Sequence, residues 1–191
     1  MRVLIACEYS GTVRDAFTRN GHDAVSVDLL PSETEGKHIV GDVLEVIRSE
    51  PFDLMIAFPP CTDLAVSGAR YFAEKRADGR QQQAIEFVRT LLDAPIERIA
   101  LENPVGVISS YIRKPDQIIQ PWFFGEDASK KTCLWLKGLP PLMATTVITK
   151  KRYANQTPSG QNKLGPSPDR WKDRSRTYQG IAQAMADQWG N

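Results

Sequence analysis

The sequence predicts an α/β protein built on a doubly wound, mostly parallel sheet. Short apolar runs typical of buried strands alternate with segments of helical spacing, and polar residues repeatedly follow the ends of the runs. This alternation indicates crossover helices between parallel strands, so ligands are expected beyond the carboxyl edge of the sheet. With 191 residues the chain has the length of one domain, and we expect residues 1–191 to form it.

Each element follows from a local pattern. Apolar runs predict strands at residues 3–6, 24–27, 39–40, 54–58, 99–101 and 133–136. Helical spacing of apolar residues predicts helices that begin near Val13 and end at Asn20, that cover residues 81–92, and that cover residues 180–189. Residues 139–174 are rich in Lys, Arg, Pro, Ser and Gln, and we expect a basic, loop-rich segment there.

Composition excludes several classes of protein. The chain is 41% hydrophobic and 25% charged, and no apolar run approaches the roughly 18 residues of a membrane span. We therefore expect a cytoplasmic protein without membrane contact. Its three cysteines, Cys7, Cys61 and Cys133, form no CxxC pair, and there are only two histidines. Neither a disulfide framework nor a metal site is expected, which leaves free thiols for chemistry.

The net charge of +1 hides a concentration of positive charge late in the chain. Residues 130–176 contain eleven Lys or Arg but only two Asp or Glu. Basic side chains with Trp171 among them are typical of segments that contact phosphates and stack on bases. A solvated loop, or one pinned by a buried tryptophan, would have the same composition.

Two reactive side chains follow neighbouring predicted strands. Pro59 and Pro60 stop the strand at 54–58 and present Cys61 at the sheet edge, while Glu102 comes directly after the strand at 99–101. A buried carboxylate without a partner is costly, so a functional role for Glu102 is favoured. A thiolate that adds to an electron-poor ring, and an acid that holds a ring nitrogen, form a sensible catalytic pair.

Pro-Pro-Cys after one strand and Glu-Asn-Pro after the next resemble the catalytic signatures of the cytosine-5 DNA methyltransferase family. The similarity spans residues 1 to about 108 and implies the Rossmann-like fold of S-adenosylmethionine-dependent methyltransferases. It implies that Cys61 adds to carbon 6 of cytosine and that Glu102 binds or protonates ring nitrogen 3. Carbon 5 then accepts a methyl group from the cofactor S-adenosylmethionine. A duplex substrate would need its cytosine flipped out.

The resemblance also implies binding residues. The cofactor-binding set begins with the turn after the first strand, Glu8, Tyr9, Ser10 and Gly11. It continues with the acid after the second strand and its neighbour, Asp28 and Leu29, with Asp42 and Val43 of a Gly-Asp-hydrophobic element, and with Pro59. The substrate-binding set is Pro60, Asn103, Pro104, Lys130 and Lys131. Thr177 to Gly180 loosely resemble the family's last motif, which returns to the cofactor site.

The sequence departs from the family in two places. Lys130 and Lys131 stand where the family has a Gln-Arg-Arg element, and lysine lacks the planar fork of arginine. Only about 35 residues replace a sizeable target-recognition domain. We therefore expect a DNA methyltransferase of relaxed specificity, or one guided by a partner protein, as a monomer or small homo-oligomer.

Three other functions stay open on the sequence. The missing recognition domain favours a relative that methylates free nucleotide or RNA. A non-catalytic nucleic-acid-binding protein on the same scaffold would not require both Cys61 and Glu102. A nicotinamide-dependent enzyme is disfavoured because no GxGxxG follows the first strand.

Overall fold

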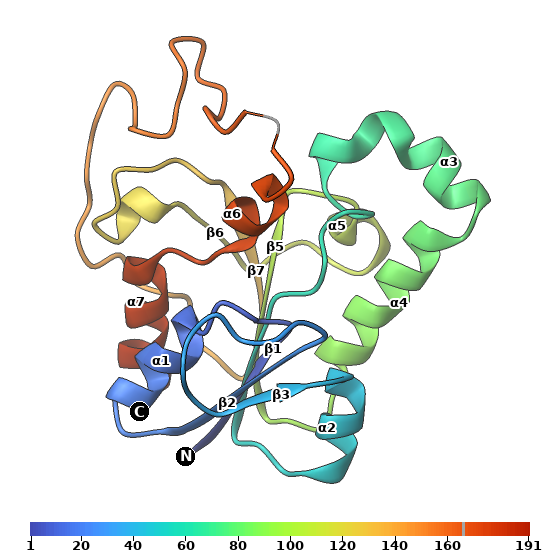
Figure 1. Ribbon diagram of the computed structural model, residues 1–191, viewed down its shortest axis with the longest axis vertical. Helices are drawn as coiled ribbons and strands as arrows, with labels where there is room; N and C mark the ends of the chain where they lie inside the picture. Colours follow the sequence, from blue (N-terminus) through green and yellow to red (C-terminus); the bar gives the residue numbers. More distant parts are fainter. Residues whose placement is uncertain (166) are drawn as a thin grey trace.

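The computed structural model describes residues 1–165 and 167–191. Its strands form one sheet in the order β3-β2-β1-β4-β5-β7-β6 (Figure 1). The strand bounds are β1 Arg2–Ala6, β2 Asp23–Asp28, β3 His38–Val40, β4 Leu54–Ala57, β5 Arg98–Pro104, β6 Gln117–Ile119 and β7 Thr132–Lys137. Strands β1 to β5 pair in parallel, whereas β7 is antiparallel to both β5 and β6. The predicted doubly wound, mostly parallel sheet is confirmed.

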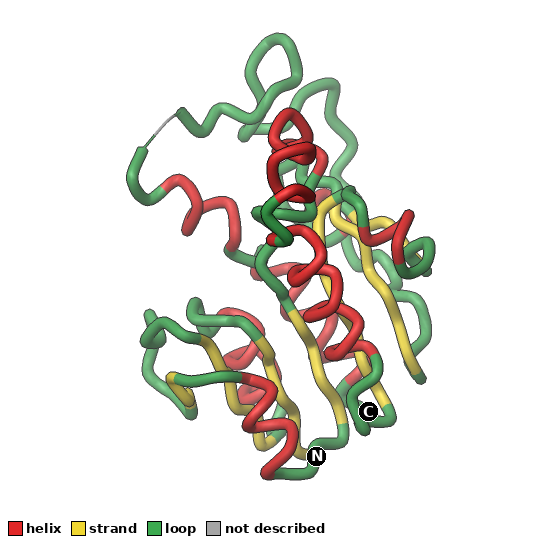
Figure 2. Tube along the Cα trace, turned by 90° about the vertical axis from the view of Figure 1, so that its right-hand side faces the viewer, coloured by secondary structure: helices red, strands yellow, loops and turns green. Residues whose placement is uncertain are grey.

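Helices cover both faces of the sheet (Figures 1 and 2). The bounds are α1 Thr12–Arg19, α2 Val43–Ser49, η1 Val66–Tyr71, α3 Phe72–Ala77, α4 Arg80–Leu92, α5 Ile108–Tyr111, η2 Pro121–Phe123, α6 Arg170–Ser175 and α7 Gln179–Trp189. Helices α1 and α7 pack into one apolar cluster with one face, and α2 and α4 pack into a second cluster with the other. Among the described residues, none of these helices is both long enough and apolar enough to cross a bilayer.

The central strands of the sheet are covered by helices on both faces, and they coincide with the apolar runs of the sequence. Every residue of β4 is buried, and so are Val3 to Ala6 of β1. A parallel strand in this position needs side chains that are apolar on both faces, which produces a continuous run rather than an alternating one. On α4, Ile85, Val88 and Leu91 are buried at helical spacing and close the second cluster.

One strand boundary differs from the prediction in a way that concerns the site. Strand β5 does not end at Leu101 but continues to Pro104, so Glu102 lies within the strand opposite Leu134 of β7. The apolar run ends at Leu101, but antiparallel pairing with β7 supplies backbone hydrogen bonds beyond it. The Glu102 carboxylate is therefore carried on paired backbone rather than on a loop.

The basic segment begins beside the C-terminal end of α7, where Met143 N donates to the Gln188 side chain at 2.7 Å, and its later described residues lie beyond the carboxyl edge of the parallel strands (Figures 1 and 2). Its aromatic residue Tyr153 stacks on Trp122, with ring centroids 5.8 Å apart and planes 12° from parallel. The side-chain amide of Asn155 both accepts from Ser129 N and donates to Ser129 O, each at 2.9 Å. These contacts pin the segment to the body of the protein, and Trp122 already covers one face of the Tyr153 ring.

Candidate active site

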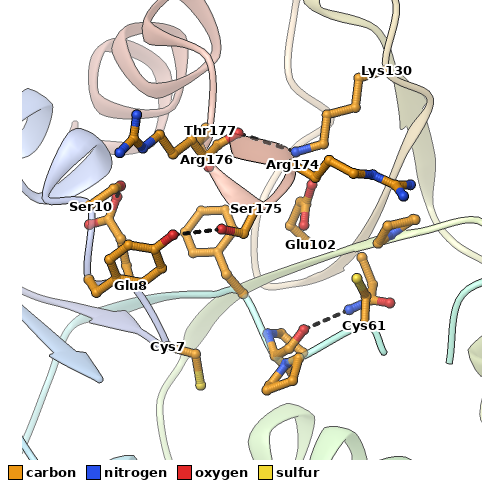
Figure 3. Close-up of a pocket in the computed structure, with 16 residues that line it drawn as sticks. Cys7, Glu8, Ser10, Cys61, Glu102, Lys130, Arg174, Ser175, Arg176 and Thr177 are labelled. Carbon is orange, nitrogen blue, oxygen red and sulfur yellow. Dashed lines mark hydrogen bonds between the residues drawn. The ribbon is translucent and has the colours of Figure 1, made fainter. Parts of the chain in front are cut away.

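A pocket opens at the carboxyl edge of the sheet, where the sequence predicts the site (Figure 3). Its lining comes from five segments, namely residues 7–10, 58–61, 102–104, 130 and 174–177. Strands β4 and β5 are parallel neighbours with Ala57 opposite Leu101, so the chain segments that follow these two residues meet at one edge. The fold thus brings Cys61 and Glu102 into a common pocket.

Cys61 opens a tight turn after β4. Its carbonyl oxygen accepts hydrogen bonds from Leu64 N at 3.0 Å and Ala65 N at 2.9 Å. Lys75 of α3 is buried and secures the same turn, because its ammonium group donates to the Thr62 carbonyl and lies 3.2 Å from the Asp63 carboxylate. The Cys61 side chain is exposed at the pocket mouth on a backbone that is held from two sides.

The Cys61 turn is joined directly to the end of β5. Asn103 Nδ2 donates to the Pro59 carbonyl at 2.9 Å, and Val107 N donates to the Leu64 carbonyl at 2.9 Å. Where the two segments cross, a Cβ on Gly106 would lie 2.2 Å from the Leu64 carbonyl oxygen. Glycine at this position therefore sets the distance between the segments that carry Cys61 and Glu102.

Gly106→Ala is expected to lower the free energy of unfolding by about 1–3 kcal/mol, because the methyl group collides with backbone that cannot rotate away. Urea denaturation measures the loss. Gly165→Ala is the matched control, since among the described residues its added methyl group meets no atom within 4 Å, its chain neighbours aside. Equal stability of the two variants would contradict the close approach at Gly106.

The Glu102 carboxyl group is a weaker acid in the pocket than in water. Burial raises the pKa of its carboxyl group, and the positive charge of Lys130 and a hydrogen bond with Thr132 only partly offset this effect. A raised carboxyl pKa increases the protonated fraction at neutral pH, so Glu102 is able to donate a hydrogen bond to an acceptor in the pocket.

The thiol of Cys61 is subject to opposing influences. Desolvation raises its pKa most strongly, and the negative charge of Glu102 raises it further, whereas Lys130 and Arg174 lower it. Two features of the site therefore favour the reactive thiolate. One is the pair of cations, and the other is protonation of Glu102, which removes the repelling charge.

The turn after β1 contributes Glu8, Tyr9 and Ser10 to the pocket lining. The Glu8 carboxylate is also committed to the fold, because it accepts from Val13 N at 2.7 Å and Arg14 N at 3.2 Å at the start of α1. The N-cap residue Gly11 has no side chain to cap this helix, so Glu8 performs that task. Glu8 thus shapes the turn, whatever the turn binds.

Gly11 is a predicted cofactor residue, but the structure gives a different reason for glycine at this position. It has φ +75° and does not line the pocket; a Cβ there would lie 2.1 Å from Thr34 Oγ1 and 2.5 Å from Arg14 Nη2. Arg14 is fully buried and binds Thr34, Glu35 O and Ser32 Oγ. The glycine therefore makes room for this arginine, which holds the loop after β2.

Four further predicted cofactor residues do not line the pocket, namely Asp28, Leu29, Asp42 and Val43. Asp28 is half-buried at the end of β2 and its neighbour Leu29 is 77% exposed, while Asp42 caps α2 through Leu44 N at 2.8 Å and Val43 is buried in the core. The carboxylates of Asp28 and Asp42 both act on Cys7, whose pKa burial and these charges raise to about 12. Both acids therefore flank the turn after β1.

Four of the five predicted substrate-binding residues line the pocket, and one does not. Pro60, Asn103, Pro104 and Lys130 line the pocket with Cys61, as does Pro59 from the cofactor set. Lys131 does not line the pocket; its side chain is exposed, and its positive charge acts on Cys133. Of the two adjacent lysines before β7, only Lys130 reaches the pocket.

The remaining wall comes from α6 and the residues after it (Figure 3). Tyr9 binds Ser175 Oγ at 3.0 Å and packs against Trp171 with ring centroids 5.9 Å apart, and Arg176 pairs with Glu33 at 2.8 Å. Basic composition points to this segment in the sequence, but nothing local indicates that Arg174 lines the same pocket as Cys61. That approach depends on contacts between residues far apart in the chain.

No protein-family model matches the sequence, and no curated protein matches it. Among solved structures, the fold is similar to that of an E. coli prophage-encoded protein described as a "putative DNA modification methyltransferase", with a TM-score of 0.52 and 16% identity. The match covers 78% of this chain and 52% of the other, so this chain spans about half the length of that protein. The likeness supports a Rossmann-like fold for the sheet described above.

Proposed function

We propose that the protein is an S-adenosylmethionine-dependent methyltransferase that acts on carbon 5 of cytosine in DNA. The observation that carries the proposal is the meeting of Cys61 and Glu102 in one pocket, beside the turn after β1. In an open α/β sheet the carboxyl edge is where ligands bind. A thiol and a carboxyl group whose pKa is raised by burial, both at that edge, form the pair that cytosine activation requires.

The chemistry assigned to the two side chains is addition and protonation. The Cys61 thiolate forms a bond to carbon 6 while Glu102 donates its proton to ring nitrogen 3, so the electron pair of the 5,6 double bond becomes available at carbon 5. S-adenosylmethionine, when bound, supplies an electrophilic methyl group. Loss of the carbon 5 hydrogen to a base then returns the electron pair, nitrogen 3 gives its proton back to Glu102, and the thiolate leaves.

The residues beside the turn after β1 fit the parts of S-adenosylmethionine. Asp28 offers a half-buried carboxylate, one oxygen of which accepts from Leu30 N at 2.9 Å, for the ribose hydroxyl groups. Leu29, 77% exposed, offers an apolar surface that a purine ring would cover. Tyr9 and Ser10 would hold the amino-acid part, and Asp42 and Val43 would flank the adenine.

DNA is the substrate class that the surroundings of the pocket favour. Lys130, Arg174 and Arg176 stand at its rim, and the basic segment lies above the same edge of the sheet. Cationic side chains at this place neutralise phosphates of a strand whose cytosine enters the pocket. Trp171, 51% exposed beside Tyr9, offers a surface on which a neighbouring base would stack.

The test is transfer of labelled methyl from S-adenosylmethionine to duplex DNA, single-stranded DNA, RNA and dCMP, followed by identification of the methylated nucleoside. Labelled 5-methylcytosine in DNA is the expected result. Label confined to RNA or dCMP would replace DNA as the substrate. DNA binding without cofactor binding or transfer would overturn the enzymatic proposal in favour of a binding protein.

A further inference from the structure

Two cations from distant parts of the chain stand at the pocket mouth with Cys61. Lys130 precedes β7, and Arg174 belongs to α6, 44 residues later. In Figure 3 both side chains lie on the same side of the pocket as Glu102. The mouth therefore combines one nucleophile, one acid and two positive charges.

Helix α6 has only six residues and is held in place by neighbours on three segments. The Tyr9 hydroxyl binds Ser175 at 3.0 Å, Glu33 pairs with Arg176 at 2.8 Å, and the Lys130 ammonium donates to the Arg176 carbonyl at 3.2 Å. At its C-terminal side the chain enters α7, whose apolar residues belong to the core. Arg174 is consequently presented to the pocket by a braced segment.

The charged groups that face Cys61 come from three elements, and their effects differ. Glu102 of β5 raises the pKa of Cys61, while Lys130 and Arg174 lower it. Lys130 also lowers the pKa of Glu102, and its ammonium group donates to the Arg176 carbonyl at 3.2 Å, so this cation has several partners. Arg174 is the other cation of the pocket lining that lowers the pKa of Cys61.

We infer that Arg174 is the activating cation of Cys61: its guanidinium group, held over the pocket by α6, stabilises the thiolate that attacks the substrate. The inference rests on the proposed function in taking Cys61 as the nucleophile. The proton of Cys61 passes to water, and the negative charge left on sulfur is balanced by a side chain that stays protonated at every working pH. The segment that replaces a recognition domain thereby supplies part of the reaction centre.

The test is the pH dependence of Cys61 alkylation by iodoacetamide in the free protein, followed by mass spectrometry of the Cys61 peptide. Arg174→Gln is expected to move the midpoint upward by about half a pH unit, since one exposed unit charge is removed near the thiol. Arg174→Lys keeps the charge and is expected to stay near wild type. Lys172→Gln removes the same charge from the same helix and is the matched control.

The outcomes separate this inference from the proposed function. A shifted midpoint in Arg174→Gln, restored by lysine and absent in Lys172→Gln, supports the inference even if no methyl transfer is found. An unshifted midpoint, or an equal shift in Lys172→Gln, overturns it even if the wild-type protein methylates DNA. Circular dichroism of each variant establishes that the fold is retained, and a shift caused by unfolding would not be reversed by lysine.

Discussion

Cys61→Ser is expected to abolish methyl transfer, with a loss of about a thousandfold or more. A serine hydroxyl keeps the size of the thiol, but it ionises far less readily and is a poor nucleophile without an adjacent base. The fold should persist, because the contacts that form the turn use the Cys61 carbonyl rather than the sulfur. Transfer of labelled methyl to DNA measures the loss.

A covalent adduct with DNA that contains 5-fluorocytosine provides an independent readout of the same change. The wild-type protein is expected to form the adduct, because fluorine at carbon 5 prevents release, and Cys61→Ser is expected to form none. Cys133→Ala is the matched control, since Cys133 is buried in β7 and does not line the pocket. Full activity of Cys61→Ser would show that the proposed mechanism is wrong.

Glu102→Gln is expected to lower transfer about a hundredfold while making Cys61 easier to alkylate. Transfer falls because glutamine cannot give nitrogen 3 a proton, and loss of a general acid typically costs 10²-fold or more. Alkylation becomes easier because the Glu102 charge is one of the causes that raise the pKa of Cys61. Without that charge the pKa of Cys61 falls, so the alkylation midpoint moves to lower pH.

The opposite directions of these two effects make the Glu102 variant informative. A variant that merely disturbs the pocket would lose transfer without a shift of the thiol midpoint toward lower pH. Glu97→Gln, an exposed change just before β5, is the matched control and is expected to leave both measurements unchanged. An alkylation midpoint that rises in Glu102→Gln would contradict the electrostatic coupling of the pair.

The elements that the sequence predicts well are those with local causes. Runs such as residues 54–58 and the helical spacing of residues 81–92 need only neighbouring residues to be recognised, and β4 and α4 appear where they are expected. Short polar elements such as α3 have no such signal. Strand β6 has only three residues, and it exists because β7 lies beside it.

In the site, too, some features are predicted by local sequence and others are not. Cys61, Glu102, Asn103 and Lys130 are indicated by motifs and do line the pocket, but the use of Glu8 as a helix cap and of Gly11 as space for Arg14 has no counterpart in the motif pattern. A motif identifies residue types in order. It does not state which neighbour each side chain contacts.

The sequence by itself determined the doubly wound sheet and placed Cys61 and Glu102 near the ends of neighbouring strands, because apolar runs and the prolines that end them act over a few residues. The tertiary structure decided which side chains share the pocket, because that depends on pairing between distant segments. β4 and β5 are neighbours through their register, and Tyr9 reaches Ser175 across 166 positions of sequence. Arg174 lines the same pocket as Cys61 because long-range contacts such as this one hold α6 in place, and those contacts form only in the folded chain.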